Sequence, residues 1–255
     1  MGTIPAFLDG RAALGLLRRS LPRGSGRLVP CRTGRELEGI LRSRLVDVVV
    51  LGPAAAHRNL AAVRAAFPTI PVVIYGVVRA EDAEPLLRWD EAGVSLVLVE
   101  GVDDAVAGDL LLRHAASRRR TASLAELPRL LRLTERLQLR AWDRLASGPG
   151  RPPRTGALAR ALGVSREHLS RQFGAGGAPT LKGVSDLLAV GASLELLANP
   201  GHSTATVARL MGFATSSHLG AVIRRVTGLC LPEARGLGSR DVVRRFLRNR
   251  HSSAT

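Results

Sequence analysis

Two similar short segments each precede a run of polar and basic residues, whose side chains could hydrogen-bond to base edges and phosphates. The segments are LARALGV at 158–164 and VARLMGF at 207–213. In both, apolar residues share one face of a short helix with an alanine, which lets a second helix cross closely. A glycine, Gly163 or Gly212, then ends the helix, because the left-handed conformation needed there favours a residue without a side chain.

A second helix is expected after each turn. Ser165 can cap a helix over 166–173, and Thr215 or Ser216 can cap one over 217–226. In each second helix, apolar residues four positions apart face the core: Leu169 and Phe173 in the first, Leu219 and Ile223 in the second. The opposite faces are polar and basic.

This pattern is the sequence form of a helix-turn-helix, whose second helix enters a DNA major groove about 12 Å wide. One copy alone would be a weak indication. Two copies joined by a helical stretch at 181–197 could reach successive major grooves, roughly 34 Å apart on one face of DNA. A rigid joining helix would fix that separation or force the DNA to bend.

The chain from 157 to 235 resembles the DNA-binding domain of the AraC/XylS family of bacterial transcription regulators. The segments that carry the resemblance are, in order, GVSREHLSRQF, SLELLANPGHSTATVARLMGF, SSHLGAVIRRVTG and PEAR. The resemblance implies a sequence-specific transcription regulator that binds double-stranded DNA.

The family also implies which residues of the first copy meet DNA. By position, Glu167, Ser170 and Arg171 would face base edges, and Arg166 would lie near phosphate. Arg171 is the strongest candidate, because a guanidinium can grip guanine O6 and N7, with roughly 1–3 kcal/mol of discrimination. His168 is expected to pack or to cap the helix. The alternative interpretation of each candidate is a solvated helix face.

The second copy departs from the family pattern. Gly220 and Ala221 stand where longer polar side chains often read bases, so base-specific reading by this copy is doubtful. Its remaining candidates are Ser216, Ser217 and His218 for base edges, and Arg224 and Arg225 for phosphates.

The first 120 residues alternate short β-branched runs with helical segments. The predicted strands lie at 4–8, 27–31, 46–51, 70–75 and 94–100, and the predicted helices at 11–20, 34–44, 54–66, 80–91 and 103–117. Near-continuous apolar strands need both faces buried, so five such units imply a doubly wound, five-stranded parallel sheet. The fold class is therefore an α/β domain followed by an all-α domain with two helix-turn-helix motifs.

The segment VDVVVLGP at 46–53 resembles the third strand of a response-regulator receiver domain, where that family places a phosphate-accepting aspartate. Gly52 stands at that position here. Receivers carry a Thr or Ser after the fourth strand and a Lys-Pro pair after the fifth, and these positions fall near Gly76 and near 100–101 here. At the end of the first strand, where receivers usually have two acidic residues, this chain has only Asp9. Phosphoryl transfer needs those groups, so we expect a degenerate receiver used for dimerisation or for sensing a partner or ligand, without phosphorylation. An unrelated flavodoxin-like or Rossmann-like sheet is the alternative.

The segment at 124–147 is leucine-rich at helical spacing and predicts one helix, before a Gly- and Pro-rich loop at 148–155. Its apolar seam could serve self-association or pack onto the next domain; the seam residues are Leu130, Leu133, Leu137 and Ala141. A last helix is expected at 239–248. The predicted domains are 1–120, a connector helix and linker at 121–150, and a DNA-binding domain at 151–255.

The 255 residues carry a net charge of +16, and most of the excess lies after Arg120. This charge predicts a polyanionic partner. The two cysteines form no ligand cluster, so we expect no metal and no cofactor, and a reducing compartment is favoured. No stretch approaches the roughly 20 apolar residues of a membrane helix, so a cytoplasmic protein without a membrane partner is expected.

The expected function is transcription regulation by a homodimer, with RNA polymerase as a further candidate partner and the effector unknown. The alternative is an interaction adaptor derived from such a regulator. The two differ in salt dependence, since the affinity of a DNA reader falls as a power of salt concentration. An enzyme is not expected, because the sequence has no Ser/His/Asp spacing, HExxH pair or metal cluster.

Overall fold

The computed structural model describes residues 2–79, 82–148 and 150–252, apart from the side chains of 117–119, 121 and 250–252. The chain divides into two compact units. The first contains Met1–Arg119 with Asn199–Gly201, and the second contains Arg120–Ala198 with His202–Thr255.

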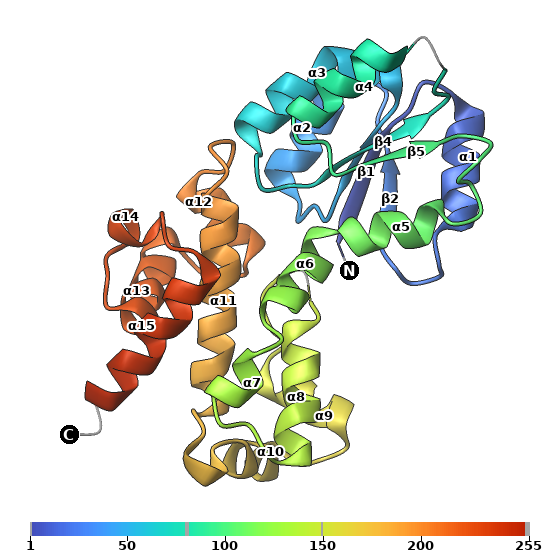
Figure 1. Cartoon of the computed structure of the whole chain (residues 1–255). Coiled ribbons are helices and arrows are strands. Elements are labelled where there is room, and N and C mark those ends of the chain that lie inside the picture. Colours follow the sequence, from blue (N-terminus) through green and yellow to red (C-terminus); the bar gives the residue numbers. More distant parts are fainter. Residues whose placement is uncertain (1, 80–81, 149, 253–255) are drawn as a thin grey trace. The chain divides into compact units, whose positions relative to one another are not determined.

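The first unit is built on a five-stranded sheet with the order β2-β1-β3-β4-β5, in which every pair is parallel (Figure 1). The strands are β1 (Thr3–Phe7), β2 (Arg27–Pro30), β3 (Val49–Leu51), β4 (Val72–Gly76) and β5 (Leu96–Val99). The helices are α1 (Arg11–Ser20), α2 (Gly34–Ser43), α3 (Pro53–Ala66), α4 (Ala83–Glu91) and α5 (Ala107–His114).

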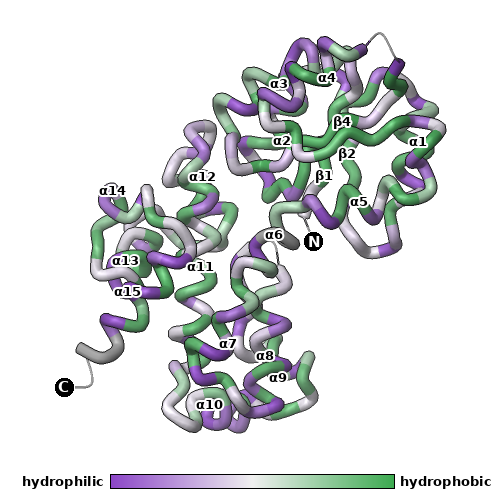
Figure 2. The backbone as a smooth tube through the Cα atoms, in the orientation of Figure 1, coloured by the Kyte–Doolittle hydropathy of each residue, from purple (hydrophilic) through white to green (hydrophobic). Residues whose placement is uncertain are grey.

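Both faces of this sheet are buried, as the apolar strands require. Val49 and Leu51 face a cluster that includes side chains of α2, α3 and α4, whereas Val50 faces one that includes side chains of α1 and α5. Figure 2 colours β1 and β4 mainly green, as hydrophobic. The predicted doubly wound parallel sheet is confirmed.

One helix of the first unit ends earlier than the sequence pattern predicts. The helix expected over 103–117 is replaced by α5 and by α6 (Ala116–Ser123). Ala115 interrupts it with a ψ of 142°, and the N–H of Ala116 donates to the carbonyl oxygen of Asp47 at 2.7 Å.

The second unit is helical in its described residues. Its helices are α7 (Leu127–Leu130), α8 (Arg136–Ala146), α9 (Thr155–Leu162), α10 (Arg166–Phe173), the 3-10 turn η2 (Ala175–Gly177), α11 (Leu181–Leu197), α12 (Thr204–Leu210), α13 (Ser216–Thr227), α14 (Leu231–Ala234) and α15 (Ser239–Ser252). The central helix α11 is buried over most of its length. The predicted C-terminal helix is present and extends four residues further, to Ser252.

The single helix predicted over 124–147 is wrong. Pro128 lies in the first turn of α7, where its missing N–H does no harm. Arg132 then adopts a left-handed φ of 55°, which ends that helix. Glu135 and Gln138 form a reciprocal capping box that starts α8 as a separate element.

The apolar seam of this segment is largely used inside the second unit. Leu133 and Ala141 are buried, whereas Leu130 is 55% exposed. Leu133 and Ala141 therefore pack inside the second unit, which is one of the two roles proposed for the seam.

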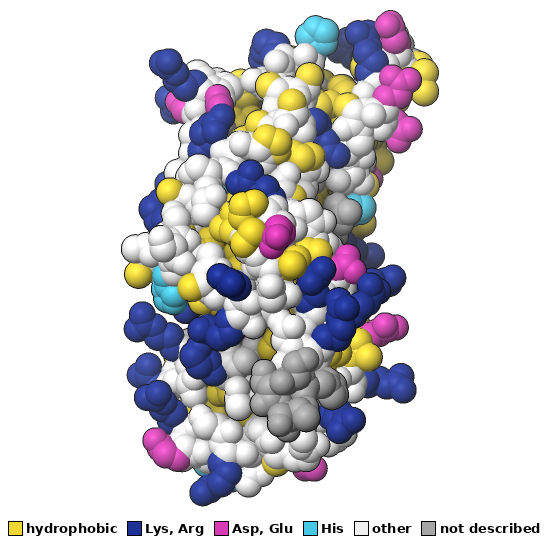
Figure 3. Space-filling view, turned by 90° about the vertical axis from the view of Figure 1, so that its left-hand side faces the viewer, with side chains coloured by type: hydrophobic (Ala, Val, Ile, Leu, Met, Phe, Trp, Pro, Cys, Tyr) yellow, Lys and Arg dark blue, Asp and Glu magenta, His cyan; other side chains and the backbone are white. Residues whose placement is uncertain are grey.

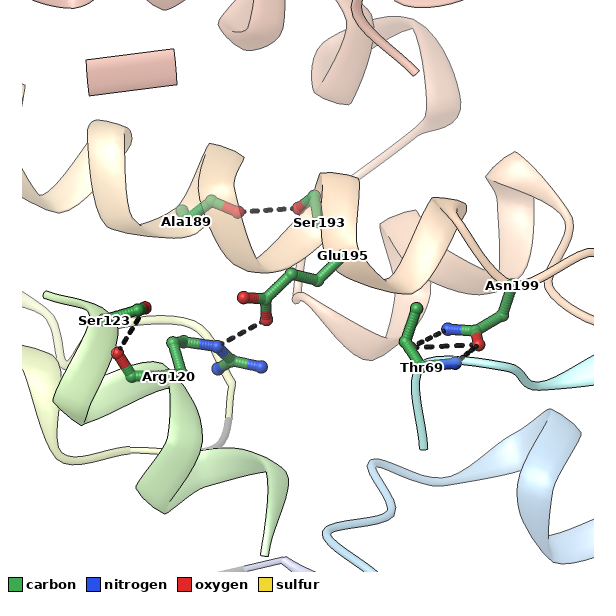
Figure 4. A network of polar contacts seen from close by, with 7 residues as sticks. All are labelled: Thr69, Arg120, Ser123, Ala189, Ser193, Glu195 and Asn199. Atoms are coloured by element: carbon green, nitrogen blue, oxygen red, sulfur yellow. Dashed lines mark hydrogen bonds and ion pairs between the residues drawn. The ribbon is translucent and has the colours of Figure 1, made fainter. Parts of the chain in front are cut away.

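An ion pair joins α6 to α11 within the second unit. The Nε of Arg120 donates to Oε2 of Glu195 at 2.7 Å, and the two side chains are 13% and 36% exposed (Figure 4). Ser123 and Ser193 each donate a hydroxyl hydrogen bond to a backbone carbonyl of their own helix, at Arg120 and Ala189 respectively.

None of the described helices is long and apolar enough to cross a membrane.

Candidate nucleic-acid interface

The first helix-turn-helix consists of α9 and α10. Gly163 follows α9 with a φ of 70° and a ψ of 31°, in the left-handed region where glycine is unstrained. The side chain of Ser165 accepts a hydrogen bond from the N–H of His168 at 3.1 Å, and so caps α10. Leu169 and Phe173 are fully buried. The turn, the cap and the buried face agree with the sequence prediction.

The second helix-turn-helix consists of α12 and α13. Gly212 has a φ of 66°, and the hydroxyl of Thr215 accepts from the N–H of His218 at 3.0 Å. Of the two predicted caps, Thr215 is therefore the one used, and Ser216 is the first residue of the helix. Leu219 and Ile223 are fully buried, as predicted.

The structure places all four DNA-contact candidates of the first copy on the exposed side of α10. Arg166, Glu167, Ser170 and Arg171 are exposed, and none forms an ion pair with a described residue. His168 is half-buried beside them. Their contacts with bases and phosphates stay predictions.

The DNA-contact candidates of the second copy differ in their exposure and in their contacts with other residues. Ser217 and His218 are exposed and Ser216 is half-buried, while the ring of His218 meets the ring of Phe213 edge to face, 5.5 Å between centres. Arg224 is exposed.

Arg225 already has a protein partner. Its Nη2 lies 2.8 Å from Oδ2 of Asp186, which also accepts from Lys182 at 2.7 Å. The guanidinium that was predicted to hold a phosphate is thus partly neutralised by α11.

Sequence reasoning missed Gln138, a buried residue of α8 that holds the end of α10. Its Nε2 lies within hydrogen-bond distance of the carbonyl oxygens of Gln172, Phe173 and Ala175, at 3.4, 2.9 and 3.2 Å. Its Oε1 accepts from the N–H groups of Thr134 and Glu135, both at 2.9 Å. The amide therefore satisfies carbonyls that every helix leaves unpaired at its end.

A second missed residue is Arg151, in the loop before α9. Its Nη1 donates to the carbonyl oxygen of Gly212 at 2.6 Å, and its guanidinium lies 4.7 Å from the ring centre of Phe213. This side chain ties the loop of the first helix-turn-helix to the turn of the second. Its partners lie about sixty positions away, so no local pattern indicates them.

The segment that closes the second helix-turn-helix contains a capping box. The N–H of Cys230 donates to Oε2 of Glu233 at 2.9 Å. Hydrogen bonds from the thiol and the N–H of Cys230 lower the pKa of Glu233, which favours its charged form.

The carboxyl ends of the strands in the first unit hold Gly52 against Asp9. A Cβ on Gly52 would lie 2.6 Å from Oδ2 of Asp9. That carboxylate accepts from the N–H groups of Ala54 and Ala55 at 3.0 and 3.2 Å, and so caps α3. The space beside Gly52 is thus filled by the carboxylate of Asp9, which has a structural role.

The neighbouring position is closed in the same way. A Cβ on Gly76 would lie 2.5 Å from the ring of Pro53, the first residue of α3. At the end of β5, the N–H of Glu100 donates to the carbonyl oxygen of Gly76 at 2.9 Å. Among the residues the structure describes, no group of three or more His, Cys, Asp or Glu is arranged to hold a metal ion.

Basic residues outnumber acidic ones in the sequence of the second unit, and Figure 3 shows many dark-blue Lys and Arg side chains on one face of the molecule. A surface of this sign attracts a polyanion.

Comparison with known protein families gives one match, in the C-terminal part of the chain. Residues 158–236 match the family model described as a helix-turn-helix domain, which is of the AraC type. No curated protein matches the chain.

Solved structures that resemble the chain include the N-terminal receiver domain of a response regulator from Bacteroides fragilis. It is 21% identical, covers 45% of this chain and 96% of its own, and gives a TM-score of 0.40. The phosphorylated cyanobacterial phytochrome response regulator RcpA is 17% identical over 44% and 89%, with a TM-score of 0.34. Full-length FixJ from B. japonicum is 13% identical over 89% and 98%, with a TM-score of 0.38.

The chain combines an α/β unit, built on an all-parallel five-stranded sheet, with an AraC-type helix-turn-helix region. The helix-turn-helix is a domain type of DNA-binding transcription regulators.

Proposed function

We propose that this protein is a sequence-specific transcription regulator that reads DNA mainly through α10. The observation that carries the proposal is the exposed face of α10, with Glu167, Ser170 and Arg171 free of ion pairs among the described residues. Such side chains can reach base edges in a major groove. In α13 the corresponding face has the short residues Gly220 and Ala221. This helix therefore fixes the position of the protein on DNA more than it recognises the base sequence.

The receiver-like unit serves dimerisation or partner binding without phosphotransfer. Support comes from Gly52, whose side-chain space is occupied by Asp9.

We also propose a homodimer formed through this unit. Large apolar side chains are exposed on this unit: Val77 after β4, Leu87 in α4, and Val102 and Val106 after β5. Recruitment of RNA polymerase belongs to the same proposal.

Salt dependence separates this function from that of an interaction adaptor. Binding of the purified chain to a fluorescent duplex is measured at several salt concentrations, and its affinity should fall as a power of salt concentration. If the chain does not bind the duplex even at low salt, the regulator is rejected and the adaptor is favoured.

A further inference from the structure

A basic groove of about 1010 Å³ lies within the second unit, beside the first reading helix. The loop before α9, the exposed sides of α9 and α10, and the first half of α11 form its walls. Its charged lining residues are Arg151, Arg154, Arg160, Arg166, Lys182 and Asp186.

The groove lies beside the first helix-turn-helix, and two of its lining residues contact the second. Arg166 and Ser170 on one wall belong to α10. Arg151 on another wall is bonded to Gly212 in the turn of the second motif, at 2.6 Å. Asp186 in the lining holds Arg225 of α13.

The loop that carries Arg154 is firmly held. Arg151 anchors it by its hydrogen bond to Gly212 and by its guanidinium over the ring of Phe213. Pro152 and Pro153 follow directly, and proline fixes the backbone φ. Arg154 is therefore presented at the groove from a stiff backbone, which lowers the entropy lost when it binds.

The charge in the groove is available to a ligand. The single acidic side chain of the lining, Asp186, is only 14% exposed and is shared by Lys182 and Arg225. Arg154, Arg160 and Arg166 are exposed, and none has an ion pair or side-chain hydrogen bond among the described residues. The groove consequently presents unneutralised positive charge.

We propose that this groove seats the sugar-phosphate backbone of the DNA that runs between the two reading helices, with Arg154 and Arg160 as phosphate contacts. The inference rests on the proposed function. Two successive major grooves on one face of a duplex are separated by a minor groove and its flanking phosphates. A basic groove beside α10, with lining residues that contact the turn of the second motif and α13, is placed to meet that segment. Arginines there fix the register on DNA without reading its sequence.

The test measures binding to a mixed-sequence duplex of about 30 base pairs, long enough for two major grooves on one face, at several salt concentrations. Arg154→Ala and Arg160→Ala should each reduce the slope of log affinity against log salt by about one, and the double variant by about two. Arg154→Lys keeps the charge and should retain the wild-type slope. Arg58→Ala removes an exposed arginine of the first unit and should also leave the slope unchanged.

The outcomes separate this inference from the function on which it rests. If the wild-type chain binds with a steep slope and the double variant keeps that slope, the groove proposal is overturned while DNA binding stands. An equal loss in Arg58→Ala would attribute the effect to total charge and would also overturn it. If the wild-type chain itself binds no duplex at low salt, the proposed function fails first. Thermal unfolding of each variant, expected to match wild type, confirms that the exposed substitutions leave the fold intact.

Discussion

At the scale of single residues, the side chains proposed to reach DNA are exposed, whereas a side chain that holds their helix in place is buried. Arg171 is exposed on α10, and no described residue pairs with it. Gln138 is buried beneath the same helix and bonds to the carbonyls at its end. The type and spacing of Arg171 could be recognised from the motif. The role of Gln138 could not, because its partners lie about 35 positions away on another helix.

Arg171→Ala should weaken binding to a specific sequence much more than binding to mixed-sequence DNA. A guanidinium bidentate to guanine supplies roughly 1–3 kcal/mol of discrimination, which corresponds to about 5- to 150-fold in affinity. Competition between the preferred duplex and mixed-sequence DNA measures the ratio. An equal loss for both duplexes would place Arg171 on phosphate instead.

Gln138→Ala should lower the free energy of unfolding by about 1–3 kcal/mol, because backbone carbonyls at the end of α10 lose their donor in a buried place. Gln172→Ala is the matched control, since that side chain is exposed and should change stability little. Chemical denaturation checks both variants. A Gln138→Ala variant as stable as the control would show that water replaces the amide without loss.

At the scale of elements, local chemistry predicted the motif helices closely. The cap at Ser165, the left-handed Gly163 and the apolar pair Leu169 and Phe173 are all encoded within a few residues, and α10 begins and ends as predicted. The segment at 124–147 was misjudged because its leucine spacing outweighed the breaks within it. The left-handed Arg132 has no sequence signature, since most residues at that φ are glycine or asparagine.

Two glycines of the motif helices should respond to alanine in opposite directions. Gly163→Ala meets no neighbouring atom but places a side chain at a φ of 70°, so it should destabilise by roughly 1–2 kcal/mol. Gly220→Ala also meets no neighbour but lies inside α13, so it should stabilise by roughly 0.5–1 kcal/mol. Thermal unfolding of the pair measures both signs. Equal shifts would contradict the left-handed assignment of Gly163.

At the scale of the whole molecule, most of the net charge of +16 belongs to the half that carries the two helix-turn-helix motifs. The other half contains the parallel sheet, and there the carboxylate of Asp9 caps α3 beside Gly52, the position proposed to have lost a phosphate acceptor. The doubly wound parallel sheet followed from the sequence pattern, in which apolar strands alternate with helices. The use of Asp9 as a cap did not, because it depends on how two distant loops meet.

Acetyl phosphate or beryllofluoride with Mg²⁺ should leave the receiver-like unit unchanged, since Gly52 offers no carboxylate. Gly52→Asp should not restore phosphorylation, because its Cβ would collide with Asp9 at 2.6 Å. Mass spectrometry after treatment measures incorporation in both proteins. Stoichiometric phosphorylation of the wild-type chain would mean that another residue accepts the phosphoryl group.

The central claim is that this chain reads DNA sequence, and selection of fragments from a random pool tests it most directly. The purified chain is incubated with the pool at low and at moderate salt, and bound fragments are sequenced over several rounds. Enrichment of one motif is predicted, strongest in the element read by α10, and it should persist at the higher salt because base contacts discriminate where phosphate contacts do not. Retention of DNA without any enriched motif would contradict the claim and would mean that the positive charge holds DNA regardless of sequence.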